Sequence, residues 1–140
     1  MLDDLSGALP ADAANLTFDD RKPSDPIRVG SDCAGYCSEV LALEQLNIKH
    51  VLVFVCEKDR TARHMCYHLH GTEGVKYYKD VARRRHATAP RVDLYVFGPP
   101  CQGFSKGGAQ AGVNDPRSHV LLHCLESKTP MANHRRPLPA

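Results

Sequence analysis

Four short apolar runs recur along the chain, each followed by small or polar residues. They lie at residues 27–30, 48–56, 75–78 and 92–97. Runs of this length with β-branched and aromatic side chains are typical of buried strands. The second run, IKHVLVFVC, is almost continuously apolar, as expected for a parallel strand that is covered on both faces. The pattern therefore predicts a sheet of about four strands.

Between these runs, the polar and apolar positions follow the period of a helix. Helices are expected at residues 38–46 and 62–69, a short one at 81–87, and one that opens at Asp115-Pro116-Arg117 with Asp115 as its cap. Alternating strands and helices predict an α/β fold with a doubly wound, Rossmann-like parallel sheet. We expect this domain to span residues 27–128, with a flexible leader at 1–26 and an irregular tail at 129–140.

Charge divides the 140-residue chain into two unequal halves. Residues 1–56 hold nine acidic and four basic side chains, whereas residues 57–140 hold seven acidic and fourteen basic ones. A basic half suits a polyanionic partner, although ordinary solvated lysine and arginine explain it equally well. No apolar run reaches membrane-spanning length, and the N-terminus lacks the basic region of a signal peptide. We expect an intracellular protein, nuclear if eukaryotic, whose six cysteines are thiols.

The most informative stretch follows the fourth apolar run and reads GPPCQGFS, residues 98–105. Two prolines fix the backbone there and place Cys101 at the carboxyl end of a strand, where open α/β sheets bind ligands. A thiol in that place is a candidate nucleophile. Taken alone, Cys101 fits a buried cysteine in a tight turn better.

The sequence PPCQGFS resembles the catalytic motif of the DNA (cytosine-5) methyltransferases, and further matches extend the resemblance over residues 27–125. It implies a methyltransferase fold and methyl transfer from S-adenosyl-L-methionine to C5 of cytosine in DNA. By this resemblance Cys101 adds to C6 of a cytosine that has been flipped out of the duplex. The residues implied to hold that nucleotide are Pro100, Gln102 and Ser105.

The turn after the first strand, SDCAGY at residues 31–36, precedes a helix, and strand–turn–helix units bind cofactors at the helix N-terminus. It resembles the family's S-adenosylmethionine loop, Phe-x-Gly-x-Gly-Gly, with Cys33, Ala34 and Gly35 as cofactor contacts. Gly35 matches the first glycine, whereas Cys33 replaces the phenylalanine and residues 37–38 replace glycines. A plain strand–helix connection explains a lone Ala-Gly turn equally well.

Two carboxylates end the next two strands. Glu57 lies 22 residues after Gly35, close to the spacing at which such folds place the acid that binds a ribose. The family resemblance assigns Glu57 to the ribose hydroxyls and Asp80 to the adenine amino group. The alternatives are a charge at a helix start for Glu57 and a helix cap for Asp80.

Two further clusters carry no expected chemistry. The basic run at residues 83–86 is interpreted as a solvated helix face, with phosphate contact as the alternative. Cys66, His68 and His70 alternate with a period of two, which scatters them around a helix, so no metal site is expected.

The resemblance stops after Lys128. The family's Glu-Asn-Val strand, its Gln-x-Arg-x-Arg motif and its target-recognition region are not found in the sequence. We therefore expect an incomplete, inactive fragment that needs a C-terminal half, with an apolar edge at residues 92–97. Two alternatives stay open: a degenerate S-adenosylmethionine- or nucleotide-binding module without catalysis, and a nonenzymatic nucleic-acid-binding fragment.

Overall fold

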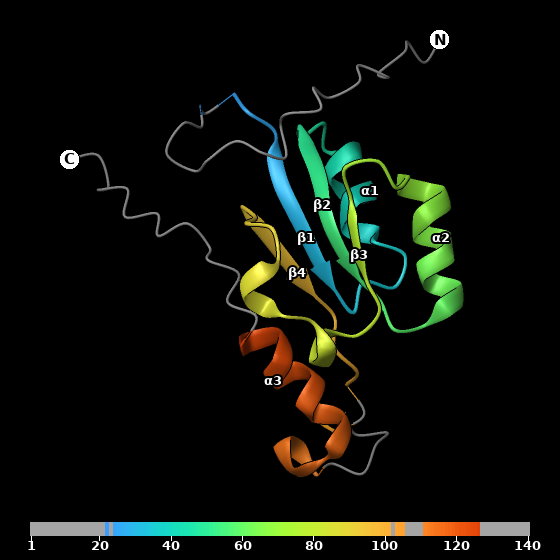
Figure 1. Cartoon of the computed structure of the whole chain (residues 1–140), viewed down its shortest axis with the longest axis vertical. Helices are drawn as coiled ribbons and strands as arrows, with labels where there is room; N and C mark the ends of the chain where they lie inside the picture. Colours follow the sequence, from blue (N-terminus) through green and yellow to red (C-terminus); the bar gives the residue numbers. More distant parts are fainter. Residues whose placement is uncertain (1–21, 23, 102, 106–110, 127–140) are drawn as a thin grey trace, which may run out of the picture.

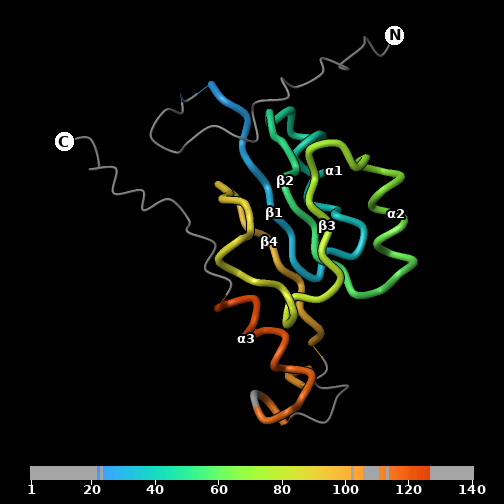
Figure 2. The backbone as a smooth tube through the Cα atoms, in the orientation of Figure 1, coloured from blue at the N-terminus to red at the C-terminus, as the bar shows by residue number. Residues whose placement is uncertain are grey.

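A computed structural model describes residues 22, 24–101, 103–105 and 111–126. Its centre is one parallel sheet with the strand order β3-β2-β1-β4 (Figures 1 and 2). The strands are β1 (Ile27–Asp32), β2 (His50–Cys56), β3 (Lys76–Tyr78) and β4 (Leu94–Phe97). This confirms the predicted α/β fold with four parallel strands, and five consecutive buried residues in β2 confirm that it is covered on both faces.

In the described residues, three α-helices and four short 3-10 helices accompany the sheet. They are α1 (Ser38–Gln45), α2 (Arg60–His70), η2 (Val81–Arg83), η3 (His86–Thr88), η4 (Gly112–Asn114), η5 (Pro116–Ser118) and α3 (His119–Glu126). In Figure 1, α3 lies beyond the arrowheads of the strands, at the carboxyl edge of the sheet. None of the helices in the described ranges is long and apolar enough to cross a membrane.

Apolar packing divides the core into clusters on either side of the sheet and at its carboxyl edge. The helices α1 and α2 contribute to one cluster through Val40, Leu43 and Cys66, which pack with Val29 and Leu52 of the sheet. On the other side, the largest side chains are aromatic: Phe54, Tyr78 and Tyr95. A third cluster joins Cys56, Val81, Val120 and Cys124, and so fixes α3 to the ends of the strands.

Close packing explains a glycine in the middle of β1. The ring of Phe54 lies directly where a side chain on Gly30 would be, so a Cβ atom there would overlap it. The register between β1 and β2 also shifts between Val29 and Gly30. A strand glycine at a bulge, where a neighbour approaches the backbone closely, is a common use of this residue.

The strand ends are in register, which decides where functional side chains can meet. Asp32 pairs with Cys56 and with Phe97, and Cys56 pairs with Tyr78, so the last residues of all four strands form one row. Backbone bonds extend the row: Gly98 N–H donates to the carbonyl of Asp32 at 3.2 Å. The loops that follow the four strands therefore begin at a common edge.

Two helix predictions were wrong in detail. The helix predicted for residues 81–87 is replaced by η2 and η3, with Arg84 between them in an extended conformation. The helix predicted from residue 115 is delayed to residue 119 by η5, although Asp115 does act as a cap, its carboxylate accepting from Arg117 N at 2.9 Å. The leader predicted for 1–26 falls mainly outside the described residues, as does the tail predicted for 129–140.

Candidate functional site

The turn after β1 is built on left-handed backbone conformations. Cys33, Gly35 and Cys37 have φ angles of 53°, 54° and 54°. Cys37 is the N-cap of α1 but makes no side-chain capping bond. The turn is instead held from the second strand, because Gly35 N–H donates to Glu57 Oε2 at 2.8 Å. The structure thus brings together Gly35 and Glu57, two of the predicted cofactor residues, with Ala34 beside them in the chain.

Glu57 is half-buried and follows β2 directly. Its second oxygen, Oε1, accepts from Asp59 N–H at 2.8 Å. Asp59, rather than Glu57, caps α2, since its carboxylate accepts from Ala62 N at 2.7 Å. Each oxygen of a carboxylate can accept more than one hydrogen bond, so Glu57 keeps acceptor capacity for a ligand.

Asp80 follows β3 and caps η2, accepting from Ala82 N–H at 3.0 Å. The cap interpretation of Asp80 is therefore confirmed. Asp80 also lines an open pocket at the ends of β2 and β3 whose lining does not include Gly35 or Glu57. The lining residues are Lys58, Arg63, Tyr78, Lys79, Asp80, Arg83 and Arg84.

Cys101 lies in a turn that begins four residues after β4. Its carbonyl accepts from Phe104 N–H at 2.9 Å and from Ser105 N–H at 2.8 Å, and its side chain is exposed. The alternative interpretation, a buried cysteine in a tight turn, is therefore wrong. Pro100 is exposed and Ser105 half-buried, whereas Gln102 lies outside the described residues.

The Cys101 turn docks onto the segment that precedes α3. Gly103 is buried, and its carbonyl accepts from Gly112 N–H at 2.9 Å. A side chain at residue 103 would overlap Ser118 Oγ and crowd Asp115. Only glycine fits this contact, which explains the glycine that follows Cys101 and Gln102.

The other five thiols differ from Cys101 in exposure. Cys37, Cys56, Cys66 and Cys124 are buried, and Cys33 is half-buried. Burial raises the pKa of Cys56 to about 12, and a hydrogen bond with Cys124, together with burial, raises the pKa of Cys33. Buried thiols with raised pKa values are poor nucleophiles. Cys101 is thus the exposed member of the set.

Residue types that can bind metal ions lie on α2 and α3. Cys66 is buried in α2 and its Sγ donates to the Gly35 carbonyl at 3.0 Å. Two pairs of histidines have the His-x3-His spacing of helical zinc ligands, which the expectation of no metal site overlooked: His64 with His68, and His119 with His123. Among the described residues, however, no three metal-ligating side chains come together.

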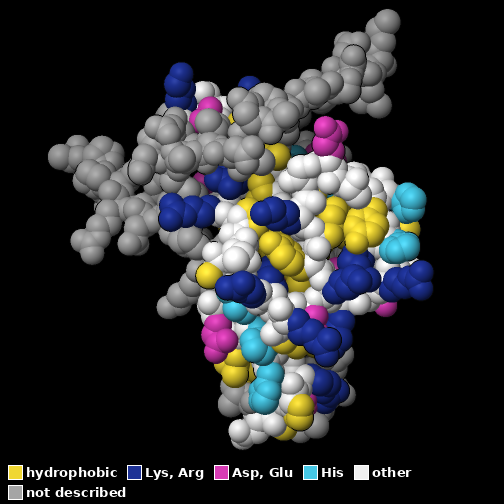
Figure 3. Space-filling model, viewed as in Figure 1, with side chains coloured by type: hydrophobic (Ala, Val, Ile, Leu, Met, Phe, Trp, Pro, Cys, Tyr) yellow, Lys and Arg dark blue, Asp and Glu magenta, His cyan; other side chains and the backbone are white. Residues whose placement is uncertain are grey.

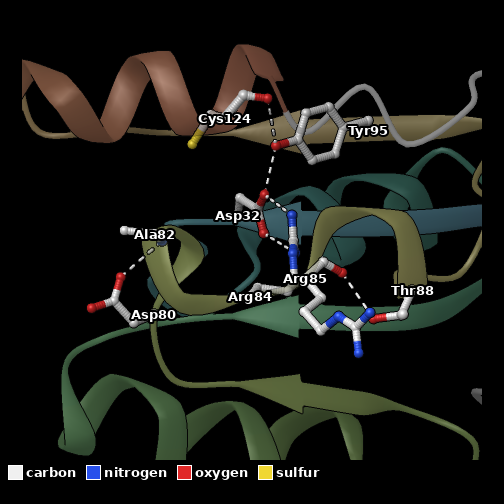
Figure 4. Close-up of polar contacts among 8 residues, drawn as sticks. All are labelled: Asp32, Asp80, Ala82, Arg84, Arg85, Thr88, Tyr95 and Cys124. Carbon is white, nitrogen blue, oxygen red and sulfur yellow. Dashed lines mark hydrogen bonds and ion pairs between the residues drawn. The ribbon is translucent and has the colours of Figure 1, made fainter.

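A buried ion pair was not predicted. The two guanidinium nitrogens Nη1 and Nη2 of Arg84 each lie 2.6 Å from an oxygen of Asp32, and both side chains are 0% exposed (Figure 4). The solvated helix face predicted for residues 83–86 is therefore wrong at Arg84, although Arg83 and Arg85 are exposed. Burial alone would lower the pKa of Arg84, but the hydrogen bonds to Asp32 raise it.

Basic side chains spread over the face of the molecule drawn in Figure 3, and histidines gather over the part occupied by α3. The exposed Lys58, Lys79 and Arg83 lie around the pocket at Asp80. This arrangement agrees with the basic charge of the second half of the chain.

Known methyltransferases resemble this chain in sequence and in fold. Over 101 residues the chain is 28% identical to the orphan methyltransferase M.Rho11sI of Bacillus phage rho11s, covering 72% of this chain and 20% of that protein. The type II methyltransferase M.AquIA of Picosynechococcus is 47% identical over 34 residues, which are 24% of this chain and 14% of that protein. Among solved structures, S. pombe Dnmt2 methyltransferase matches with a TM-score of 0.56 and 25% identity, over 71% of this chain and 31% of that one.

The family model for C-5 cytosine-specific DNA methylases matches residues 28–130. This range contains the turn after β1, Glu57, Asp80 and the Cys101 motif. The chain spans about a fifth of the phage methyltransferases it matches. Because the family model covers most of the chain, we conclude that this protein belongs to the C-5 cytosine-specific DNA methylase family.

Proposed function

We propose that the protein carries the nucleophile and the cofactor-binding side of an S-adenosylmethionine-dependent methyltransferase that acts on C5 of cytosine in DNA. One observation carries this proposal. Cys101, the exposed thiol of six, follows β4 at the same sheet edge at which Gly35 and Glu57 are hydrogen-bonded. A nucleophile and a cofactor turn at the carboxyl ends of adjacent parallel strands are the arrangement that such chemistry needs.

The residues that would hold S-adenosylmethionine are Cys33, Ala34 and Gly35 in the turn, together with Glu57 and Asp80. The spare acceptor capacity of Glu57 fits a ribose, whose two hydroxyls are donors. Asp80 has one oxygen engaged in capping and the other 4.0 Å from Lys58 Nζ, so it can still accept from an adenine amino group. Once bound, the cofactor supplies the methyl group.

The chemistry proposed for Cys101 begins with a thiolate. Its sulfur forms a bond to C6 of the cytosine, which converts C5 into an enamine-like carbon that accepts the methyl group. Loss of the C5 proton then expels the thiolate, breaks the S–C6 bond and restores the ring. The target base must leave the stack to expose C6, and we propose that Pro100, Gln102 and Ser105 hold the flipped nucleotide.

We further propose that residues 1–140 do not methylate DNA without the remainder of the family's domain. The chain covers 20% of M.Rho11sI and 31% of Dnmt2. The family's Glu-Asn-Val carboxylate, which by resemblance contacts N3 of the cytosine, is not found in the sequence. Without that contact, addition of the thiolate to C6 lacks a partner that stabilises charge on the ring.

The test compares the chain with a longer version that carries the rest of the domain. Calorimetry should show that residues 1–140 bind S-adenosylmethionine and that Cys101→Ser leaves the affinity unchanged. In the longer version, Cys101→Ser should abolish transfer of tritium from the labelled cofactor to cytosine-containing DNA. Transfer at the wild-type rate in that variant would show that Cys101 is not the nucleophile.

A nonenzymatic nucleic-acid-binding role is the second candidate. It is favoured by the exposed cations Lys58, Lys79 and Arg83 around one pocket, since lysine and arginine neutralise phosphates. This role predicts DNA binding that weakens steeply with salt and does not require the cofactor. Cofactor binding without salt-sensitive DNA binding would exclude it.

A further inference from the structure

We propose that Asp32, Arg84 and Tyr95 are positioning residues that hold the cofactor turn, the Asp80 turn and the Cys101 strand in one fixed arrangement. This inference rests on the proposed function, because it assigns a role toward that site. It starts from an ion pair that lies wholly inside the molecule, where neither charge is exposed to water. The three side chains and their contacts are drawn in Figure 4.

Both charges of the pair have polar or aromatic contacts. Arg84 binds both oxygens of Asp32 through two parallel bonds of 2.6 Å, the geometry that gives arginine–carboxylate pairs their fixed orientation. The hydroxyl of Tyr95 donates to Asp32 Oδ2 at 2.6 Å. Aromatic rings cover the guanidinium, with Cζ of Arg84 4.9 Å from the ring centre of Phe54 and 5.2 Å from that of Tyr78.

Asp32 and Arg84 each lie next to a different part of the proposed site. Asp32 is the last residue of β1, directly before Cys33, and its carbonyl accepts from Gly98 N–H, which opens the segment leading to Cys101. Arg84 directly follows η2, whose N-cap is Asp80, and it lines the same pocket as Asp80.

Tyr95 supplies the third attachment, from β4, the strand that leads to Cys101. Its hydroxyl also lies 3.1 Å from the carbonyl oxygen of Cys124 in α3. The Asp32 carboxylate, at the end of β1, therefore contacts both the segment after η2 and strand β4. Each of these three segments is connected to a different part of the proposed site.

Burying Asp32 and Arg84 removes two charges from water, which is costly, and apolar residues of similar volume often replace such a pair with no loss of stability. Stability alone therefore does not require Asp32 and Arg84. A planar two-pronged bond permits one relative orientation of its partners, whereas apolar side chains can shift against one another. The pair thus supplies orientation at the edge where the proposed ligands bind.

Stability and positioning are separate properties of the pair, so the test measures both. In the 140-residue chain, the double variant Asp32→Leu/Arg84→Met removes both charges together, and Arg84→Lys keeps the charge without the two-pronged bond. Arg85→Met is the matched control, because Arg85 is an exposed neighbour in the same basic run and does not line the pocket at Asp80. Each variant is measured for its melting temperature, its affinity for S-adenosylmethionine and the amide exchange rates of Gly35, Ala82 and Gly98.

We expect the double variant to melt close to the wild type but to bind S-adenosylmethionine about 10-fold more weakly. The three amides, one in each segment that the pair connects, should exchange faster. Arg84→Lys should show the same loss of affinity, and Arg85→Met should change neither quantity. A double variant with wild-type affinity and wild-type exchange would overturn the proposal, because the pair would then be a replaceable part of the core.

Two outcomes need separate controls. If the wild-type chain does not bind S-adenosylmethionine, the proposed function fails, and the exchange rates alone then decide the positioning role. If the double variant does not fold, Tyr95→Phe takes its place, since it removes only the hydroxyl that reaches Asp32 and Cys124. Faster exchange at Gly98 in Tyr95→Phe would support the proposal, and unchanged exchange there would refute it.

Discussion

Replacing Glu57 tests the candidate cofactor site most directly, because this side chain has both an internal role and a proposed ligand. Glu57→Ala removes the acceptors of two backbone N–H groups, those of Gly35 and Asp59, each at 2.8 Å. Hydrogen bonds to a charged group contribute about 1.5–3 kcal/mol each when buried. Since Glu57 is only half-buried, water replaces part of this, and we expect a loss of about 1–2 kcal/mol in the free energy of unfolding.

In a chain of this size, that loss lowers the melting temperature by about 3–8 °C. The cofactor should be affected separately, because the variant also lacks the proposed acceptor for the ribose hydroxyls. A lost bond to a charged group weakens binding by about 10–100-fold. Glu57→Gln keeps one carbonyl oxygen and should fall between the wild type and Glu57→Ala in both measurements.

Differential scanning calorimetry and titration calorimetry at a temperature where all variants are folded would separate the two effects. Glu73→Ala is the control, since it removes the same charge from an exposed turn after α2 and should change stability by less than about 0.5 kcal/mol. If Glu57→Ala lowers the melting temperature but leaves the affinity for S-adenosylmethionine unchanged, Glu57 supports the turn without contacting the cofactor. If neither quantity changes, the hydrogen bonds of Glu57 are irrelevant to the turn and the reasoning is wrong.

Three further predictions concern other parts of the structure. Iodoacetamide should label Cys101 before the other cysteines, because it alone of the six is exposed; mass spectrometry showing Cys56 labelled first would contradict this. Gly103→Ala should destabilise the turn by about 1–3 kcal/mol, since the added methyl overlaps Ser118 Oγ, whereas unchanged thermal stability would mean that the loop shifts freely. Burial, with the nearby charge of Arg84, lowers the pKa of His86 from 6.5, so the folded state favours neutral His86 and stability should fall as the pH drops below 6.5. His86→Asn should flatten that fall, and parallel pH profiles for the two proteins would refute the assignment.

The strands could be predicted from the sequence because each is a short apolar run bounded by polar or small residues. The position of Glu57 was also predictable, since a carboxylate directly after a buried strand lies at the carboxyl edge of a parallel sheet. Its bond to Gly35 was not, because a spacing of 22 residues does not specify which backbone group the side chain reaches. The helix predicted at residues 81–87 failed because Arg84 turns inward and interrupts it.

The burial of Arg84 could not be predicted from the sequence pattern. In the sequence, Arg83, Arg84 and Arg85 are equivalent, and only the fold distinguishes the buried one. Asp32 did carry a signal, since a charge at the end of a strand that is otherwise buried requires a partner. The partner lies 52 residues away, beyond the reach of any local rule.

The residues of the turn after β1 differ from the family's loop, but three of them have the left-handed backbone conformation that favours glycine. Cys33 and Cys37 adopt left-handed conformations, as does Gly35, and this costs a residue with a side chain about 1–2 kcal/mol. At Cys37 burial offsets the cost, because the side chain is 0% exposed and packs with Val40 and Cys66 in the core. The Cys37 thiol therefore faces the interior, and the replaced glycine adds no side chain to the surface where the cofactor would approach. Packing from within therefore replaces the conformational freedom of glycine at Cys37, whereas Ser38, at the other replaced glycine, is exposed.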